Sequence, residues 1–255
     1  MNHSKPCVFC GATRGLSKEH FWPEWLSSYL PPAVPNSHIT ELHSGEGKQP
    51  QRLERQSQRP GAVKTKKIRA VCAACNNGWM STVEAQVKPI VLALLDRSRT
   101  TLLESDIRSL ANTALTVPDD RHAVRRGSVP TYFRIFAAFH TLEAKTAYYR
   151  HSTTISLSRD GPVPTLPRTI SRNIQLTSFL MGPVCFYVTA ARVDQFNGAV
   201  LDPAHAMHRL WPDPQVSIDM TALQPLGQAE IATACRSLER LVRDPRVIYG
   251  GPLRR

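Results

Sequence analysis

The stretch Cys7-Val8-Phe9-Cys10 and its later counterpart Cys72-Ala73-Ala74-Cys75 decide how the first third of this chain folds. Two residues separate the cysteines of each stretch, so both sulfurs of one turn can reach a common ion at about 2.3 Å. Two such turns complete a tetrahedron of thiolates with no open coordination position. The spacing therefore predicts a structural Zn²⁺ held by Cys7, Cys10, Cys72 and Cys75.

Two disulfides, or four unrelated buried thiols, are the alternatives to this zinc site. The segment Met1-Asn2-His3-Ser4-Lys5 leads into no apolar stretch, so we expect no signal peptide and a cytoplasmic protein. Disulfides are rare in that reducing compartment, which favours the metal. Cys185 and Cys235 each stand alone in an apolar setting, and we expect both to be inert core residues.

The segment between the cysteine pairs, Leu16-Ser17-Lys18-Glu19-His20-Phe21-Trp22-Pro23, carries side chains suited to chemistry. Adjacent residues of an extended strand point to opposite faces, so Glu19 and His20 can do separate work. Glu19 can bind a divalent cation while His20 acts on a water molecule.

This order of residues, a CxxC pair, an acidic residue before His with Pro three positions later, and a second CxxC pair followed by Asn, resembles the zinc-stabilised branch of the HNH, or ββα-metal, endonucleases. The run Cys75-Asn76-Asn77-Gly78-Trp79-Met80 is similar to a subgroup of bacterial and phage HNH-like proteins. The resemblance covers residues 7 to 85. It implies that Glu19 and Asn76 hold a catalytic Mg²⁺ or Mn²⁺ and that His20 is the general base.

The chain departs from the family pattern at Lys67, where the family has an asparagine that orients the catalytic histidine. A charged lysine cannot accept a hydrogen bond. Either a backbone carbonyl, or a side chain such as Asn77 or His43, takes over the orienting role, or the histidine is poorly oriented and the enzyme is slow or inactive. The connection of about residues 24–69 is also roughly twice as long as the fold requires, and we expect a long loop there.

Basic residues crowd the end of this connection, and a single acid, Glu54, lies among them. At this density, beside a phosphodiesterase site, they would neutralise nucleic-acid phosphates. The formal net charge of +12 favours polyanionic partners in the same way. We expect nucleic acid, in particular double-stranded DNA, to contact Arg52, Arg55, Lys64, Lys66, Lys67 and Arg69; the alternative is a solvated basic loop with no partner.

The sequence predicts an α+β protein. The resemblance implies a small zinc-stabilised ββα-metal core over residues 1–98, and the remaining sequence predicts an α+β domain with its own core over residues 99–255. Helices are expected over 81–95, 104–116 and 227–243, with a cap at Ser81, capping by Ser105 and Asp106, and a kink or break at Pro89. Strands are expected over 131–140 and 146–157 and in a hairpin of 173–181 with 184–193. The most apolar run, 179–191, is too short to span a membrane.

Three functions remain open at this point. The first is a metal-dependent HNH-type DNA endonuclease or nickase. The second is a catalytically inactive nucleic-acid-binding protein on the same scaffold, which Lys67 favours. The third is a structural or interaction protein in which zinc replaces a larger core.

Overall fold

The computed structural model describes residues 6–30, 36–44, 52–61, 65–114, 133–142, 148–158, 169–191, 206–212 and 215–235. Helices and sheets are both present, as expected for the α+β class. Lys64, and the ends of the helices expected to reach residues 116 and 243, lie outside the described residues. The side chain of Cys235 also lies outside them, whereas Cys185 is a buried free thiol in the core, as expected.

The first part of the fold is a strand pair followed by a long helical segment. Strand β1 (Glu19–His20) pairs antiparallel with β4 (Lys67–Ile68). The helical segment runs through α1 (Ala73–Cys75), the π-helical turn η3 (Asn76–Met80) and α2 (Ser81–Leu95). This strand, strand, helix order is the one that the cysteine and histidine motifs predict.

Two details of the helical segment differ from expectation. The path is already helical at Met80, so Ser81 lies inside the segment and forms no cap. Gly78 alone departs from helical geometry in η3, with φ −93° and ψ −115°. Pro89 lies inside α2 and does not divide it, although its ring removes one backbone donor.

The connection expected to be a long loop contains regular structure. A 3-10 helix, η1 (Glu24–Leu26), follows β1 directly. Strands β2 (Asn36–Ser44) and β3 (Arg52–Gly61) then form an antiparallel hairpin whose register shifts between Leu42 and His43. Among the described elements the hairpin contacts chiefly itself, so the connection leaves the compact part of the molecule as a two-stranded arm.

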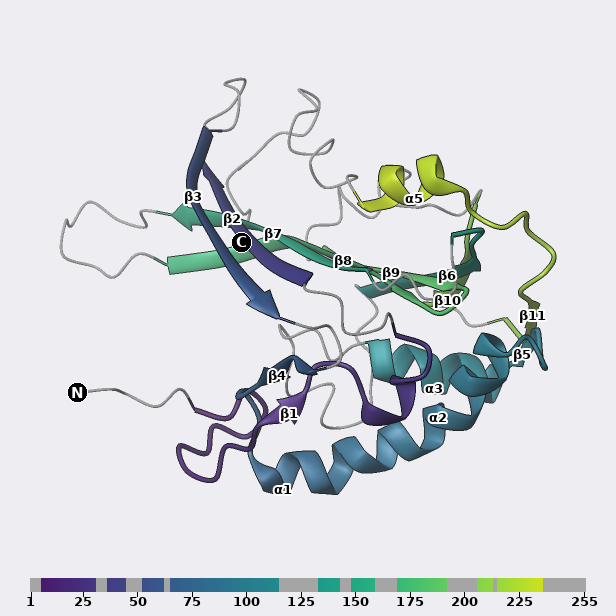
Figure 1. Ribbon diagram of the computed structural model, residues 1–255, viewed down its shortest axis with the longest axis horizontal. Helices are drawn as coiled ribbons and strands as arrows, with labels where there is room; N and C mark the ends of the chain where they lie inside the picture. Colours follow the sequence, from purple (N-terminus) through teal and green to yellow (C-terminus); the bar gives the residue numbers. More distant parts are fainter. Residues whose placement is uncertain are drawn as a thin grey trace, which may run out of the picture.

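The second part of the fold is a five-stranded antiparallel sheet of order β10-β6-β9-β8-β7. Its strands are β6 (Phe133–Phe139), β7 (Tyr148–Ser158), β8 (Thr169–Met181), β9 (Val184–Ala191) and β10 (His208–Trp211). In Figure 1, α2 and α3 (Glu104–Ala114) lie on one side of this sheet and α5 (Gln228–Cys235) on the other. The expected strands are confirmed, and β10 is an addition.

The turn between β8 and β9 is where α2 meets the sheet. Gly182 has φ +53°, and a Cβ atom there would lie 2.5 Å from Cδ2 of Leu95. A side chain would therefore be strained by the backbone and would clash with the end of α2. Glycine at this turn lets the helix and the sheet pack closely.

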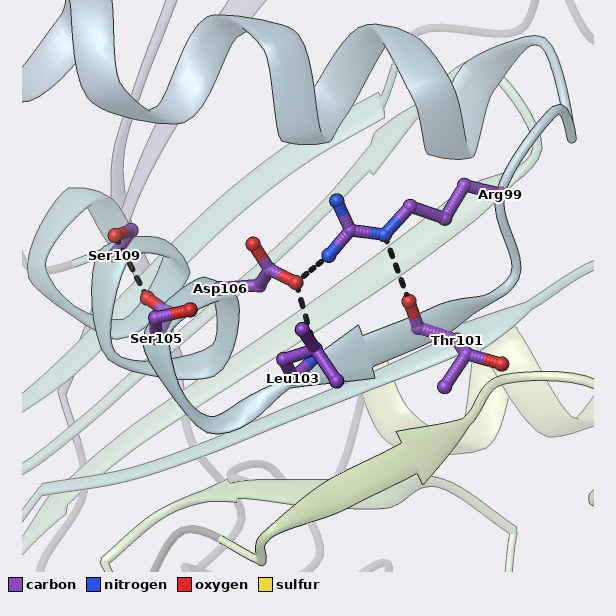
Figure 2. Close-up of polar contacts among 6 residues, drawn as sticks. All are labelled: Arg99, Thr101, Leu103, Ser105, Asp106 and Ser109. Atoms are coloured by element: carbon purple, nitrogen blue, oxygen red, sulfur yellow. Dashed lines mark hydrogen bonds and ion pairs between the residues drawn. The ribbon is translucent and has the colours of Figure 1, made fainter.

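A polar network holds the junction between α2 and α3 (Figure 2). Asp106 accepts a hydrogen bond from the backbone N–H of Leu103 at 2.9 Å and forms an ion pair with Arg99, whose Nε donates to the Thr101 carbonyl at 3.0 Å. Asp106 thus caps α3, as expected. Ser105 instead offers its carbonyl to the Ser109 hydroxyl.

One cluster of buried apolar side chains extends through both parts of the molecule. Leu26 and Leu94 from the first part belong to it, together with Ile107, Phe133 and Ile135 from beyond residue 98. The short strands β5 (Thr101–Leu103) and β11 (Ser217–Asp219) pair with each other at its margin. The core of the second part is therefore continuous with that of the first.

Candidate metal centre and histidine site

The four cysteines of the two CxxC pairs converge on one point. Their sulfur atoms all lie within 4.8 Å of one another, and the Sγ atoms of Cys10 and Cys72 are 3.5 Å apart. A tetrahedral zinc site with bonds of about 2.3 Å places its sulfurs about 3.8 Å apart. All four are free thiols, so the disulfide alternative is not seen, and their convergence on one point is compatible with a shared metal ion.

Backbone hydrogen bonds shape the first cysteine turn. The N–H of Gly11 donates to the Cys7 carbonyl at 2.9 Å, and the N–H of Cys7 donates to the Ala12 carbonyl at 2.7 Å. Gly11 has φ +75°, a conformation that glycine adopts without strain. The N–H of Val8 donates to the Ala70 carbonyl at 2.9 Å and so connects this turn to the second cysteine pair.

The cysteines are not electrostatically equivalent. Burial raises the pKa of Cys7, but N–H groups of Cys10, Cys72 and Phe9 outweigh burial and lower it to about 6. Burial, reinforced by the Cys10 and Cys72 side chains, raises the pKa of Cys75 to about 12. A bound cation would be needed to ionise all four thiols at neutral pH.

Aromatic packing joins the first cysteine turn to the helical segment. The rings of Phe9 and Trp79 meet edge to face with centroids 5.0 Å apart. Trp79 is partly buried against the core cluster. This contact fixes the start of the helix, where Asn76 lies, relative to the cysteines.

The strand pair places Lys67 beside the histidine. His20 is registered opposite Lys67, and Glu19 opposite Ile68. The position where the family resemblance expects an orienting asparagine is therefore next to His20 in space. Lysine at this position is exposed.

Asn76 lies at the start of η3, close behind the second cysteine pair. The Nδ2 of Asn76 donates to Oδ1 of Asn77 at 3.2 Å. This hydrogen bond uses the donor of Asn76 and not the Oδ1 atom of Asn76. The hydrogen bond recorded for Asn77 Oδ1 therefore comes from Asn76. The side chain of His43 lies outside the described residues.

The carboxylate of Glu24 lies beside His20, and the sequence analysis did not predict this contact. Nδ1 of His20 lies 3.3 Å from Oε1 of Glu24. The His20 side chain is 24% exposed and that of Glu24 79% exposed. The signal in the sequence is the four-residue spacing across the turn at Trp22-Pro23.

His20 and Glu24 also line a cavity of about 220 Å³. Trp22, Pro23, Ser27 and Leu30 complete its walls. The cavity gives solvent and small ligands access to the imidazole. It lies on the same turn that carries the Glu24 carboxylate.

The expected nucleic-acid-binding residues occupy three settings. Lys67 and Arg69 are exposed beside β1. Lys66 is half-buried, with Nζ 4.8 Å from the centroid of the Phe21 ring, and burial lowers its pKa. Arg52 and Arg55 lie on β3, and their side chains are outside the described residues.

In the part of the chain that the structure describes, the cysteines form the sole group of three or more His, Cys, Asp or Glu side chains close enough to share a metal. Glu19 and Asn76 offer one carboxylate and one amide oxygen, a donor set that suits Mg²⁺ with water completing its coordination. Among the described residues, no helix has the length and apolar character needed to cross a bilayer.

No family model, curated protein or solved structure matches this chain.

Proposed function

We propose that the protein is a zinc-stabilised, metal-dependent endonuclease or nickase of the HNH type that hydrolyses phosphodiester bonds in DNA. The observation that carries the proposal is the arrangement of β1, β4 and the helical segment around four converging thiols. In this arrangement His20 lies on β1 and Asn76 at the start of η3, and these positions support the proposal of a ββα-metal site.

Zinc is the metal proposed for the cysteines. Four thiolates in tetrahedral reach are a closed ligand set, which leaves no position for substrate. The role of this zinc is to hold the first cysteine turn against the start of the helix. It takes no part in the chemistry.

His20 is proposed to act on the attacking water. Its imidazole borders a solvent-accessible cavity and can accept the proton of a water that attacks phosphorus in line. Glu19 and Asn76 would hold the divalent cation, which, when bound, supplies charge stabilisation to the phosphate. Glu19 precedes His20 in the strand, so the two side chains leave opposite faces.

Double-stranded DNA is the proposed substrate. Lys67 and Arg69 are exposed close to His20, and the arm formed by β2 and β3 carries Arg52 and Arg55 along one strand. A two-stranded antiparallel ribbon has the width to enter the major groove of B-form DNA. The net charge of +12 adds long-range attraction to the phosphates.

A nucleic-acid-binding protein without catalysis is the second candidate, and the register of Lys67 opposite His20 favours it. A charged lysine beside the general base supplies no acceptor to orient it. Both candidates share the zinc site and the basic surface. DNA cleavage distinguishes the endonuclease from the non-catalytic binding protein.

A plasmid-nicking assay with added Mg²⁺ or Mn²⁺ tests the proposal. Because a general base contributes about 10² to 10⁴-fold, His20→Ala should lower the cleavage rate by that factor. Zinc content and DNA affinity should stay at wild-type values. Equal cleavage by wild type and variant would assign the activity to another site, and an inactive wild type that binds DNA would favour the second candidate.

A further inference from the structure

Separate backbone hydrogen bonds fix the chain next to His20 and next to Glu24. The N–H of Phe21 donates to the Lys66 carbonyl at 2.8 Å and so anchors the end of β1. The chain then turns at Pro23, and the N–H of Ser27 donates to the Glu24 carbonyl at 3.0 Å within η1. The backbone on both sides of the pair is therefore fixed by hydrogen bonds.

Buried side chains next to the pair fix it further. Trp22 is 8% exposed and packs against Phe179 of the large sheet, and Leu26 is fully buried. Glu24 lies between these two anchors in sequence. The backbone of Glu24 is therefore placed near the imidazole by a turn that is packed on the core, and its exposed carboxylate lies within reach of Nδ1.

A carboxylate at Nδ1 determines which nitrogen of the ring can act as a base. A neutral imidazole that donates its Nδ1 proton to a carboxylate keeps its lone pair on Nε2. The 3.3 Å separation is an ion-pair distance, and a small rotation of the exposed Glu24 side chain would bring the two atoms into hydrogen-bond geometry. Because Glu24 is mostly exposed, solvent screens its charge, and its effect on the ring is chiefly orientation.

We infer that Glu24 is the positioning residue for His20, taking the role that the family resemblance gives to an asparagine at the position of Lys67. This inference rests on the proposed function. Lys67 lies opposite His20 but has no acceptor to offer, and Glu24 supplies one from the other side of the turn. The Nε2 atom is then the atom that receives the proton of the attacking water.

The first test reads the tautomer of His20 by ¹⁵N NMR in alkaline buffer, where histidine is neutral. The wild type should carry its proton on Nδ1, and Glu24→Ala should shift the population towards the Nε2-protonated form. Glu24→Gln keeps an acceptor oxygen and should retain part of the wild-type signature. A wild-type ring protonated on Nε2, or a tautomer that Glu24→Ala leaves unchanged, would overturn the inference.

Glu84→Gln is the matched control. Glu84 accepts a hydrogen bond from Nε1 of Trp25 at 2.6 Å, so it is a carboxylate of the same neighbourhood that does not contact His20. The same change of charge there should leave the His20 tautomer as in the wild type. A shift of equal size in Glu84→Gln would contradict a specific role for Glu24.

The second test measures cleavage kinetics. Removing the partner that orients a functional histidine typically costs about 10 to 100-fold, so Glu24→Ala should lower kcat by that factor with KM nearly unchanged. In combination with His20→Ala, Glu24→Ala should cause no further loss of kcat. A loss no larger than that of Glu84→Gln would overturn the inference. If the wild type does not cleave DNA, the proposed function fails, and the tautomer measurement still decides whether Glu24 positions the ring.

Discussion

The strands of the cysteine region and those of the five-stranded sheet differ in length and burial, and therefore in what stabilises them. Strands β1 and β4 have two residues each, half-buried in β1 and exposed in β4. In β6, by contrast, every residue except Arg134 is buried. A two-residue strand pair cannot stabilise itself in water, whereas a buried strand between two neighbours can. The proposed catalytic residues thus lie on short elements next to the thiol cluster, tied through Trp22 and Leu26 to the core shared with the sheet, whereas the sheet is stabilised mainly by its own buried strands.

Removing the metal should have the largest effect on the fold, and it tests directly whether the two regions are stabilised separately. Structural zinc sites contribute apparent binding free energies of about 10–16 kcal/mol, and binding is coupled to folding. Cys72→Ser should therefore lose the one zinc per chain and the hydrogen-exchange protection of residues 65–80. Protection of β6 and β9 should persist. A wild type that purifies without zinc, or loss of protection in both regions together, would contradict this division.

A cavity in the sheet should have the converse effect. Phe136 is fully buried in β6 and packs near Tyr187, so Phe136→Ala should lower the free energy of unfolding by about 3–5 kcal/mol in denaturant titrations. Zinc content should stay at the wild-type value. Val216→Ala, at a residue 82% exposed, is the control and should change stability by less than about 0.5 kcal/mol. Zinc loss in Phe136→Ala would show that the two regions fold as one.

Acid should weaken the sheet through His140, which is 1% exposed at the end of β6. Burial lowers the pKa of His140; a contact with the Gly182 backbone acts in the opposite direction without outweighing burial, and the charge of Arg97 adds to the lowering. Neither ring nitrogen makes a hydrogen bond with the described residues. The folded state therefore resists protonation that the unfolded chain accepts near pH 6.5.

The sign of this pH dependence follows from the direction of the shift. The contribution of His140 to stability is complete above pH about 6.5 and declines as the pH falls towards the lowered pKa of the folded state, by at most about 1.4 kcal/mol per pH unit. Urea titrations at a series of pH values should show this slope. His140→Gln should remove it, and a variant that keeps the full slope would assign the acid sensitivity to other groups.

Charge removal near β4 should have the smallest effect, seen in binding and not in stability. Lys67→Asn combined with Arg69→Gln should weaken DNA binding across all sequences and lower the salt slope by up to about 0.9 for each lost phosphate contact. Arg108→Gln is the control, because Arg108 is exposed on α3 and paired with Glu104 at 2.6 Å. A slope equal to that of the wild type would remove Lys67 and Arg69 from the DNA interface.

Features that depend on local chemistry could be predicted from the sequence. The CxxC spacing predicts the thiol cluster, the apolar stripe with Asp106 predicts α3, and Gly182-Pro183 predicts the turn between β8 and β9. Each of these signals is contained in a few neighbouring residues. None requires knowledge of the rest of the fold.

Features that depend on distant contacts could not be predicted. Strands β5 and β11 have three residues each and pair across more than a hundred positions, so no periodicity reveals them. The helical segment starts before Ser81 although Asn76, Asn77 and Gly78 favour helix poorly, because packing such as that of Trp79 on Phe9 overrides propensity. The Glu24 carboxylate reaches His20 only through a turn whose geometry comes from the burial of Trp22 and Leu26.

The close contact between Leu95 and Gly182 fixes the C-terminal end of α2, so that both ends of this helix are held. Its first end continues the segment that contains Cys75 and Asn76, and its last end rests on the turn of the large sheet. The helix between them is about 22 Å long and behaves as a rigid rod. A side chain introduced at Gly182 would have to displace the Leu95 side chain at one end of this helix, and any shift of the helix that follows would also move Cys75 and Asn76 at the other end.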